Sequence, residues 1–228
     1  MNVNFNGLGF APADILLPKE GTDMTKWSVV ACDQYTSEPE YWEAVDALVG
    51  DAPSALRLIL PEAKLNQPGV EEEIAKINRT MTEYLAEDLF TVYPNALIYI
   101  ERSQSNGRIR HGLIGKLDLE SYDFTPGSGA LTRATEGTVL DRIPPRVKVR
   151  KDAPIELPHI MVLIDDDEKC MIEPLAKETA SMQPVYDFEL MQGGGHLKGW
   201  LLNPGQIERM AVGLRHLASA PVQERKYG

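Results

Sequence analysis

One stretch of the chain concentrates residue types that bind phosphate or carboxylate groups. Residues 132–146 hold three arginines, three threonines and two acids within fifteen positions. Arginine guanidinium groups suit phosphate and carboxylate oxygens, and threonine hydroxyls add neutral hydrogen bonds. The stretch therefore predicts a site for a small anionic ligand. The candidate binding residues are Arg133, Thr135, Thr138 and Arg142, and the candidate catalytic residues are Glu136 and Asp141.

These residue types allow two interpretations. In the functional one, Glu136 acts as a general base or organises a divalent metal through phosphate oxygens. In the structural one, the stretch is an exposed helix start: Thr135 caps the helix, and arginine and aspartate side chains pair along the surface. The sequence leaves both open.

A second candidate is the glycine run Gly193–Gly195, which is followed by His196. Glycines let backbone N–H groups approach a phosphate closely, so Gly194 and Gly195 are candidate phosphate-binding positions. No Walker A pattern accompanies them, and a tight hairpin between two strands also needs glycine. His196 is either a base or a solvated loop histidine.

Other segments indicate little chemistry. Cys32 follows an apolar run, but no histidine partner is identifiable, so a buried thiol is expected. The acids of residues 165–168 lack the glycine and spacing of a calcium loop, and they read as a solvated turn. No histidine and cysteine set has zinc spacing, so no metal-ligating protein site is predicted.

Composition narrows the class of protein. The 228 residues carry a formal net charge of −11, and the sequence pI is about 4.9. An acidic chain repels phosphate backbones, which argues against a nucleic-acid partner. No apolar run reaches the length of a membrane helix, and the first residues lack a secretory pattern. We therefore expect a cytoplasmic protein that does not enter a membrane.

The order of apolar patterns predicts an α+β fold with a mixed, largely antiparallel sheet and flanking helices, in a single domain over residues 1–228. Asn106-Gly107 predicts a hairpin turn, and Asn203-Pro204 predicts the start of the last helix. The expected strands are 27–31, 55–60, 96–100, 110–117, 158–164 (as a central strand), 185–191 and 197–202, and the expected helices are 37–50, 70–90, 168–181 and the one after 203.

Three segments together resemble a bacterial family called domain of unknown function 1015. They are Trp27-Ser28-Val29-Val30-Ala31-Cys32-Asp33-Gln34-Tyr35, then Arg133-Ala134-Thr135-Glu136-Gly137-Thr138 with Asp141-Arg142, then Tyr186-Asp187-Phe188-Glu189-Leu190-Met191 before the glycines. The family looks distantly similar to the ParB/sulfiredoxin-like group, which includes nucleotide-binding partition proteins and kinases of free serine.

The resemblance implies an ATP- or ADP-dependent phosphotransferase that uses Mg²⁺ and acts on a small metabolite, such as the amino acid serine. Arg133 and Arg142 would then hold phosphate. Many relatives have histidine where this chain has Ala134, so a role for that side chain does not carry over. Relatives also continue into an Asp-Gly-Asn/His-His segment, which this chain lacks before Gly228. We therefore expect the chain to be the N-terminal part of a longer protein. The alternatives are a nucleotide-responsive regulatory domain and a protein-interaction domain.

Overall fold

The computed structural model describes residues 3–125, 127–134, 137, 139–157 and 159–220, and their fold is α+β, as the sequence predicts. The strands are β1 (Phe10–Ala11), β2 (Ala13–Pro18), β3 (Phe90–Ala96), β4 (Ile98–Ser103), β5 (Ile109–Ile114), β6 (Lys116–Leu117), β7 (Tyr122–Asp123), β8 (Thr132–Arg133), β9 (Gln183–Leu190) and β10 (Gly195–Leu201). The α-helices are α1 (Met24–Trp27), α2 (Pro39–Val49), α3 (Val70–Ala86), α4 (Ile143–Arg150), α5 (Glu173–Ala176) and α6 (Pro204–Ser219). Short 3-10 turns are η1 (Ala55–Leu58), η2 (Glu62–Lys64), η3 (Leu119–Ser121), η4 (Leu140–Arg142) and η5 (Thr179–Ser181).

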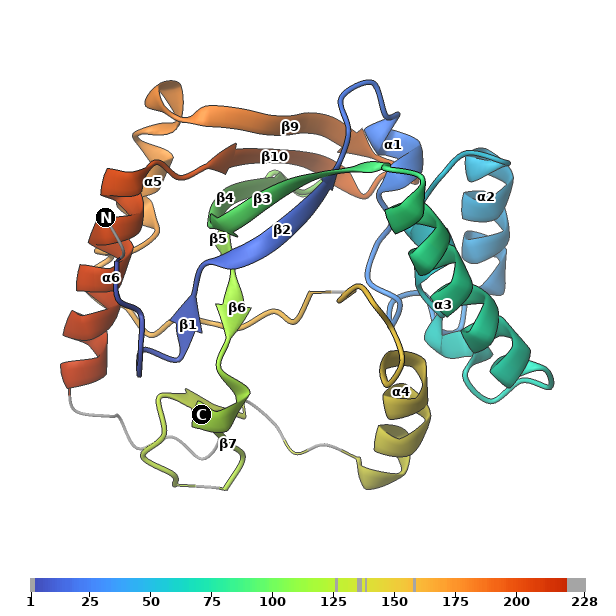
Figure 1. Cartoon of the computed structure of the whole chain (residues 1–228), viewed down its shortest axis with the longest axis horizontal. Helices are drawn as coiled ribbons and strands as arrows, with labels where there is room; N and C mark the ends of the chain where they lie inside the picture. Colours follow the sequence, from blue (N-terminus) through green and yellow to red (C-terminus); the bar gives the residue numbers. More distant parts are fainter. Residues whose placement is uncertain (1–2, 126, 135–136, 138, 158, 221–228) are drawn as a thin grey trace.

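A four-stranded antiparallel sheet forms the centre of the molecule (Figure 1), in the order β5-β4-β10-β9. The predicted hairpin over Asn106-Gly107 joins β4 to β5, and Gly107 has the positive φ of 78° that such a turn requires. Three two-stranded ribbons accompany the sheet. β2–β3 and β1–β6 are antiparallel, and β7–β8 is parallel. The sheet types are therefore mixed and largely antiparallel, as predicted.

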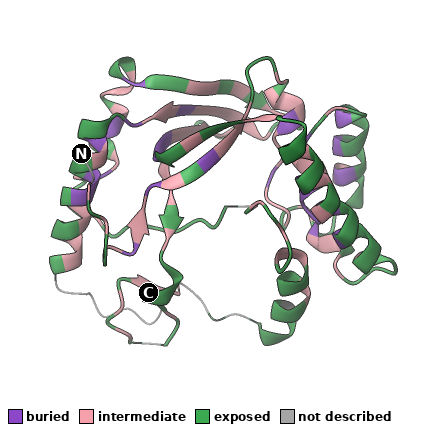
Figure 2. Ribbon diagram, in the orientation of Figure 1, coloured by how far each residue is buried: buried purple, intermediate pink, exposed green. Residues whose placement is uncertain are grey.

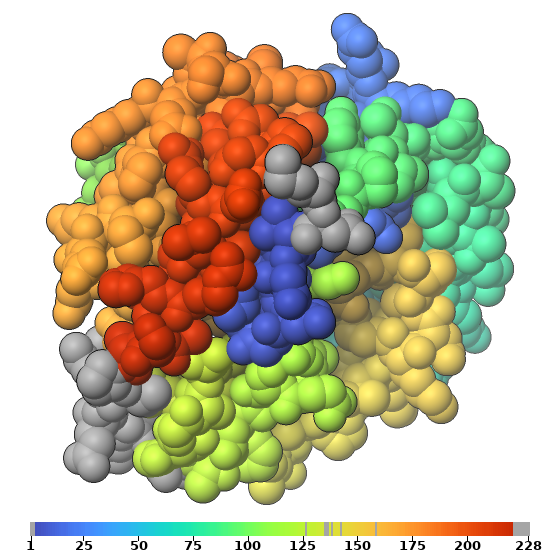
Figure 3. All heavy atoms as spheres, turned by 60° about the vertical axis from the view of Figure 1, so that its left-hand side comes forward, coloured from blue at the N-terminus to red at the C-terminus, as the bar shows by residue number. Residues whose placement is uncertain are grey.

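Helices α5 and α6 cover one face of the sheet. Tyr99 of β4 is fully buried there beside Leu175 of α5 and Met210 of α6. Helix α6 begins at Asn203, as the sequence predicts. The Asn203 side chain accepts from the Gln206 backbone N–H, and the Gln206 side chain accepts from the Asn203 backbone N–H. This reciprocal capping satisfies backbone donors that would otherwise lack partners. Figure 3 shows the N-terminal segment lying against α6.

The opposite face is covered by the β2–β3 ribbon, which crosses the sheet in Figure 1. Ile15 of β2 and Ile98 of β4 are buried together in this layer, and Tyr186 of β9 packs beside them. A separate core joins α1, η1 and α3. Trp27, Leu58 and other apolar side chains are buried against the face of α3 that carries its helical apolar spacing.

Burial falls off in the part of the chain that contains β7 and α4, where Figure 2 shows mainly exposed residues. Helix α4 has no buried side chain among its described residues. Its partly buried Val149 packs against the core that contains Trp27 and Leu58, and ion pairs add to this contact. Arg146 reaches Glu62 at 2.9 Å, and Lys148 reaches Glu71 of α3 at 2.6 Å. Basic α4 therefore docks through the acidic residues before and within α3.

Several predicted elements are wrong. The expected central strand over residues 158–164 is wrong for its described residues: Ile160–Ile164 belong to no strand and are exposed, and Pro158 lies outside the described residues. Trp27 ends helix α1, because Asp23 caps a helical turn at residues 24–27. Residues 55–58 form η1, since the Ser54 hydroxyl caps a tight turn at the backbone N–H of Leu56. The expected helix over 168–181 is reduced to α5 and η5.

Candidate functional site

The structure describes only some of the residues of the predicted anion site. Arg133 lies on β8, where it is partly buried and in register with Asp123 of β7. Asp141 is exposed in η4. Thr135, Glu136 and Thr138, and the side chain of Arg142, lie outside the described residues. The roles of the six residues in binding and catalysis therefore stay predictions.

The basic residues that follow this segment have structural partners. Arg146 and Lys148 pair with Glu62 and Glu71, as described above, and Arg150 pairs with Glu156. Each pair leaves at least one side chain largely exposed, so each stabilises the fold by about 1 kcal/mol or less. The geometry of Arg146, at the end of the 132–146 stretch, and of the two basic residues after it therefore matches surface ion pairing.

The glycine run forms the turn between β9 and β10. Gly193 and Gly195 have positive φ values of 69° and 95°. A Cβ atom on Gly195 would lie 2.0 Å from the backbone oxygen of Ser103, so only glycine fits there. The Gly194 carbonyl accepts hydrogen bonds from Arg102. Chain geometry thus accounts for Gly195, and the phosphate-binding role of Gly194 and Gly195 stays a prediction.

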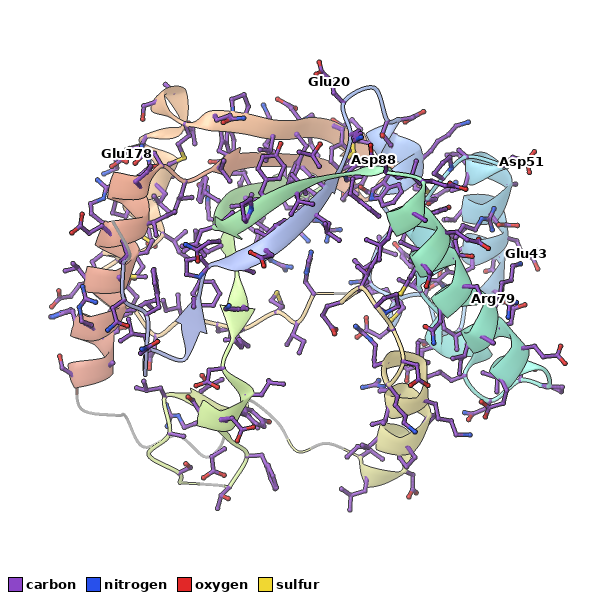
Figure 4. All side chains as sticks on the ribbon, viewed as in Figure 1. Glu20, Glu43, Asp51, Arg79, Asp88 and Glu178 are labelled. Carbon is purple, nitrogen blue, oxygen red and sulfur yellow. The ribbon has the colours of Figure 1, made fainter. Side chains whose placement is uncertain are left out.

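The glycine turn lies far from the segment that contains Arg133. The turn is at the β9 end that contacts α1, while β8 pairs with β7 at the other side of the molecule (Figure 1). Two hollows of the surface lie elsewhere. One, of about 470 Å³, is lined by α3 residues, among them Arg79 (Figure 4), with Asp152 and Pro154, and another of about 220 Å³ lies beside Trp27. Neither of these two hollows is lined by a described candidate residue, and the shared site stays a prediction.

The structure instead gathers titratable groups on one face of the sheet. We call this group the polar sheet face, and its members come from four adjacent strands. They are His111 of β5, Glu101 of β4, His196 and Lys198 of β10, and Asp187 and Glu189 of β9. Cross-strand register places Glu101 opposite both His111 and Lys198, so opposite charges alternate across the strands.

His196 is held between two carboxylates. Its Nδ1 lies 2.5 Å from Glu189 Oε1, and its Nε2 contacts Asp187. These hydrogen bonds, to Glu189 first and Asp187 second, raise the pKa of the imidazole. The His196 hydrogen bond lowers the pKa of Asp187, and Lys198 at 3.2 Å adds to that effect. Both ring nitrogens face carboxylate acceptors, so this arrangement favours the protonated imidazole, which donates from both nitrogens.

Tyr99 links Glu101 to His111. Its hydroxyl donates to Glu101 Oε1 at 2.8 Å and lies 2.6 Å from His111 Nδ1. The single phenolic proton goes to the carboxylate, so the hydroxyl oxygen accepts from His111 Nδ1–H. Burial, with the bond to Glu101, raises the pKa of Tyr99. The other ring nitrogen of His111, Nε2, belongs to a side chain that is more than a third exposed.

Sequence reasoning missed the polar sheet face. His196 was interpreted as either a base or a solvated loop residue, whereas it lies in β10 with two acid partners. The sequence does contain a pattern that predicts this arrangement. Asp187 and Glu189 alternate before the turn and His196 and Lys198 alternate after it, which places all four on one face of a hairpin.

A second unusual feature is what we call the apolar segment, Ile160–Ile164. All five side chains are large and apolar, and their exposed fractions range from 42% to 80%. The segment belongs to no helix or strand and runs between the α4 side of the molecule and α5 (Figure 1). Arg110 of edge strand β5 donates to Met161 Sδ at 3.7 Å, which links the segment to the sheet.

Two further observations concern the described residues alone. Their histidine, cysteine and acidic side chains form no cluster of three or more arranged to hold a metal ion. None of the helices in the described part is both long enough and apolar enough to cross a membrane. Cys32 and Cys170 are free thiols, and burial raises the pKa of both.

The fold and these surfaces define a class: an α+β domain with an antiparallel sheet, a charged sheet face and an exposed apolar segment. Comparison with family models then gives the family. A model described as "Protein of unknown function (DUF1015)" matches residues 16–219, and the chain belongs to that family. Comparison with curated proteins and with solved structures found no match.

Proposed function

We propose that the chain is a protein-interaction domain whose binding element is the apolar segment. The observation that carries this proposal is the exposure of five consecutive large apolar side chains. Single exposed apolar residues are normal on a protein surface, but contiguous apolar patches of several hundred Å² mark interaction sites. The five residues of the apolar segment are consecutive and each is more than two-fifths exposed, so they form one contiguous apolar surface.

The backbone of the segment supports the same proposal. Among the residues that the structure describes, Ile160–Ile164 form no backbone hydrogen bond. A continuous run of β-branched and aliphatic residues is typical of a strand that is buried on both faces. The segment thus has the composition of a central strand without the neighbours of one. A partner that supplies a strand would satisfy its N–H and C=O groups and cover its side chains.

Further exposed apolar side chains occur in η3, β7, η4 and α4 and in the residues between them. The most exposed are Leu119, Phe124, Val139, Leu140 and Val147. Most of the exposed large apolar residues therefore lie between residues 119 and 164, although Ile109 of β5 and Val212 of α6 are also more than half exposed.

A photo-reactive amino acid placed at Leu163, the most exposed position of the segment, tests this proposal in the cells that produce the protein. We expect adducts that map to one segment of one protein and that disappear when Val162→Lys is added. Val212 of α6, at 55% exposure, provides the matched control position. Adducts that are as scattered at Leu163 as at Val212 would contradict the proposal.

A second candidate function, nucleotide-dependent phosphoryl transfer to a small metabolite such as serine, rests on the segment from 132 to 146. Its support is the residue types there, together with the exposed Asp141 and the position of Arg133 on β8. The described residues do not include enough of the site to test how Mg²⁺ with ATP or ADP would fit. Calorimetric titration of each nucleotide with Mg²⁺ against the chain provides the test. Binding that is lost in Arg133→Ala supports the site, and no heat with either nucleotide contradicts it.

A further inference from the structure

We propose that Arg102 of β4 and Arg110 of β5 together bind a phosphate group, on the face of the sheet opposite the polar sheet face. These two residues, which we call the arginine pair, stand directly opposite each other in the register of the two strands. Side chains in that position have Cβ atoms roughly 5 Å apart, and like charges there destabilise a sheet. An anion between the two guanidinium groups would remove the repulsion. Such a site would exist whether or not the apolar segment binds a protein.

The face that carries the arginine pair has no acidic residue from the four strands of the sheet. Alternation along β4 places Arg102 on the same side as Ile98 and Ile100, which pack against the β2–β3 ribbon. The acids of the four strands all lie on the other side, as members of the polar sheet face. In its own row, Arg102 is followed by Leu197 of β10 and Phe188 of β9. Opposite charges are therefore paired on one side of the sheet, while two positive charges are placed together on the other.

Neither guanidinium group has a carboxylate partner among the described residues. Arg102 donates from Nε and Nη2 to the Gly194 carbonyl at 3.3 and 3.0 Å, and Arg110 donates from Nη1 to Met161 Sδ at 3.7 Å. Both acceptors are neutral, so neither balances the positive charge. Each arginine has five N–H donors, so several remain available on both side chains. Because Arg102 is partly buried, its charge is withdrawn from water and is stabilised by an anionic partner.

The surroundings hold Arg102 in position and add a neutral donor. The hydrogen bonds to Gly194 fix the guanidinium plane, so little side-chain freedom is lost when a ligand binds. Burial raises the pKa of Tyr41 of α2 and nearby Tyr35 adds to that effect, whereas the charge of Arg102 opposes it, so the Tyr41 hydroxyl lies within electrostatic range of Arg102. The Tyr41 ring is stacked on Tyr35 with centroids 3.7 Å apart, and its hydroxyl has no hydrogen-bond partner among the described residues.

Two guanidinium groups and a hydroxyl suit a phosphate group better than a carboxylate. One guanidinium fork already matches both oxygens of a carboxylate. A phosphate group presents three strong acceptor oxygens, which two forks and a hydroxyl can share. The net charge of −11 repels a long phosphate backbone, so the ligand is a small molecule. Because Arg110 is exposed, the phosphate can be free or can belong to a larger metabolite.

Calorimetric titration with inorganic phosphate, at an ionic strength held constant with sodium chloride, tests the site. We expect saturable binding with a dissociation constant of about 1 mM, which a few charge-assisted hydrogen bonds can supply. Arg102→Gln and Arg110→Gln should each weaken binding by about 10-fold or more, because each removes one charged contact. Arg79→Gln is the matched control, since Arg79 of α3 is exposed and forms no ion pair among the described residues, and it should leave the affinity unchanged. Equal weakening in all three variants, or no saturable binding by the parent chain, overturns the inference.

Two further ligands define the chemistry of the site. Acetate should bind about 10-fold more weakly than phosphate or worse, because it lacks the additional oxygens, and equal binding by acetate overturns the choice of a phosphate group. Adenosine monophosphate separates the two sources of phosphate. Tighter binding than inorganic phosphate, lost in Arg110→Gln, supports a phosphate group of a larger metabolite, and equal binding supports free phosphate.

Thermal unfolding gives a second readout, which a purely structural arginine would not produce. Without phosphate, Arg110→Gln should melt at the same temperature as the parent chain or higher, because the substitution relieves the like-charge contact. With phosphate at about ten times its dissociation constant, the melting temperature of the parent should rise by about 3–6 °C. The melting temperature of Arg110→Gln should not change with phosphate. A variant that gains as much from phosphate as the parent does overturns the inference.

Discussion

Substitution of Gly195 by alanine tests the account of the β9–β10 turn. The φ of 95° at this position strains a residue that carries a Cβ atom, which costs about 1 kcal/mol. The new Cβ would also lie 2.0 Å from the Ser103 backbone oxygen, so β4 and β10 must separate locally. Overpacking of this kind costs about 1–3 kcal/mol. We expect the free energy of unfolding to fall by about 3 kcal/mol in Gly195→Ala.

Gly193→Ala is the matched control. Gly193 also has a positive φ, of 69°, but its Cβ would meet nothing within 4 Å. Gly193→Ala therefore introduces backbone strain but no clash, and the free energy of unfolding should fall by about 1 kcal/mol. Urea unfolding followed by circular dichroism measures the free energy of unfolding of both variants. The expected difference between Gly195→Ala and Gly193→Ala corresponds to a gap of about 4–8 °C in melting temperature for a chain of this size. Equal losses in the two variants would refute the close approach of Gly195 to β4.

Three further outcomes follow from the described contacts. Ser54→Ala should lower the free energy of unfolding by about 1–3 kcal/mol by urea titration, because the buried hydroxyl donates at 2.7 Å to the Lys26 carbonyl and leaves it unpaired when removed. Glu178 lies near the start of α6 (Figure 4), and hydrogen bonds from Arg209 and Gln206 lower its pKa to about 2. Its contribution to stability is therefore complete above about pH 4.5 and is lost as the pH falls toward 2, so the melting-temperature deficit of Glu178→Gln should shrink over that range. The pKa of His196 is raised in the folded chain, so its pH dependence has the opposite sign. The loss of stability in His196→Asn should be largest at acidic to neutral pH and should shrink as the pH rises through the folded pKa. It should stay at about 1 kcal/mol or less, because the acid partners of His196 are mostly exposed.

Local signals predicted the elements that local chemistry determines. The Asn106-Gly107 turn, the start of α6 at Asn203 and the amphipathic pattern of α3 all appear where the sequence places them. Each depends on residues close together in the chain, so the pattern and the physical cause coincide. The glycine hairpin belongs to the same class, although the reason for Gly195 is the backbone of a distant strand.

Elements that depend on distant partners could not be predicted in the same way. Val162 and its neighbours have the composition of a buried strand, but composition cannot say whether a neighbouring strand is present. His196 gained its acid partners from strand register, which a residue-by-residue interpretation does not use. The resemblance identified the family, whereas the roles of Arg133 and Glu136 stay predictions.

Hydrogen exchange of the apolar segment tests the interaction function most directly. In the dilute chain, the amides of residues 160–164 should exchange within about 10-fold of the rate for an unstructured peptide, since they have no backbone partner among the described residues. In the complex captured through Leu163 they should slow by at least 100-fold, while buried β4 residues such as Tyr99 are slow in both states. Amides of the segment that are already as slow as those of β4 in the dilute chain would mean that the segment pairs within its own copy, which would contradict the proposed function.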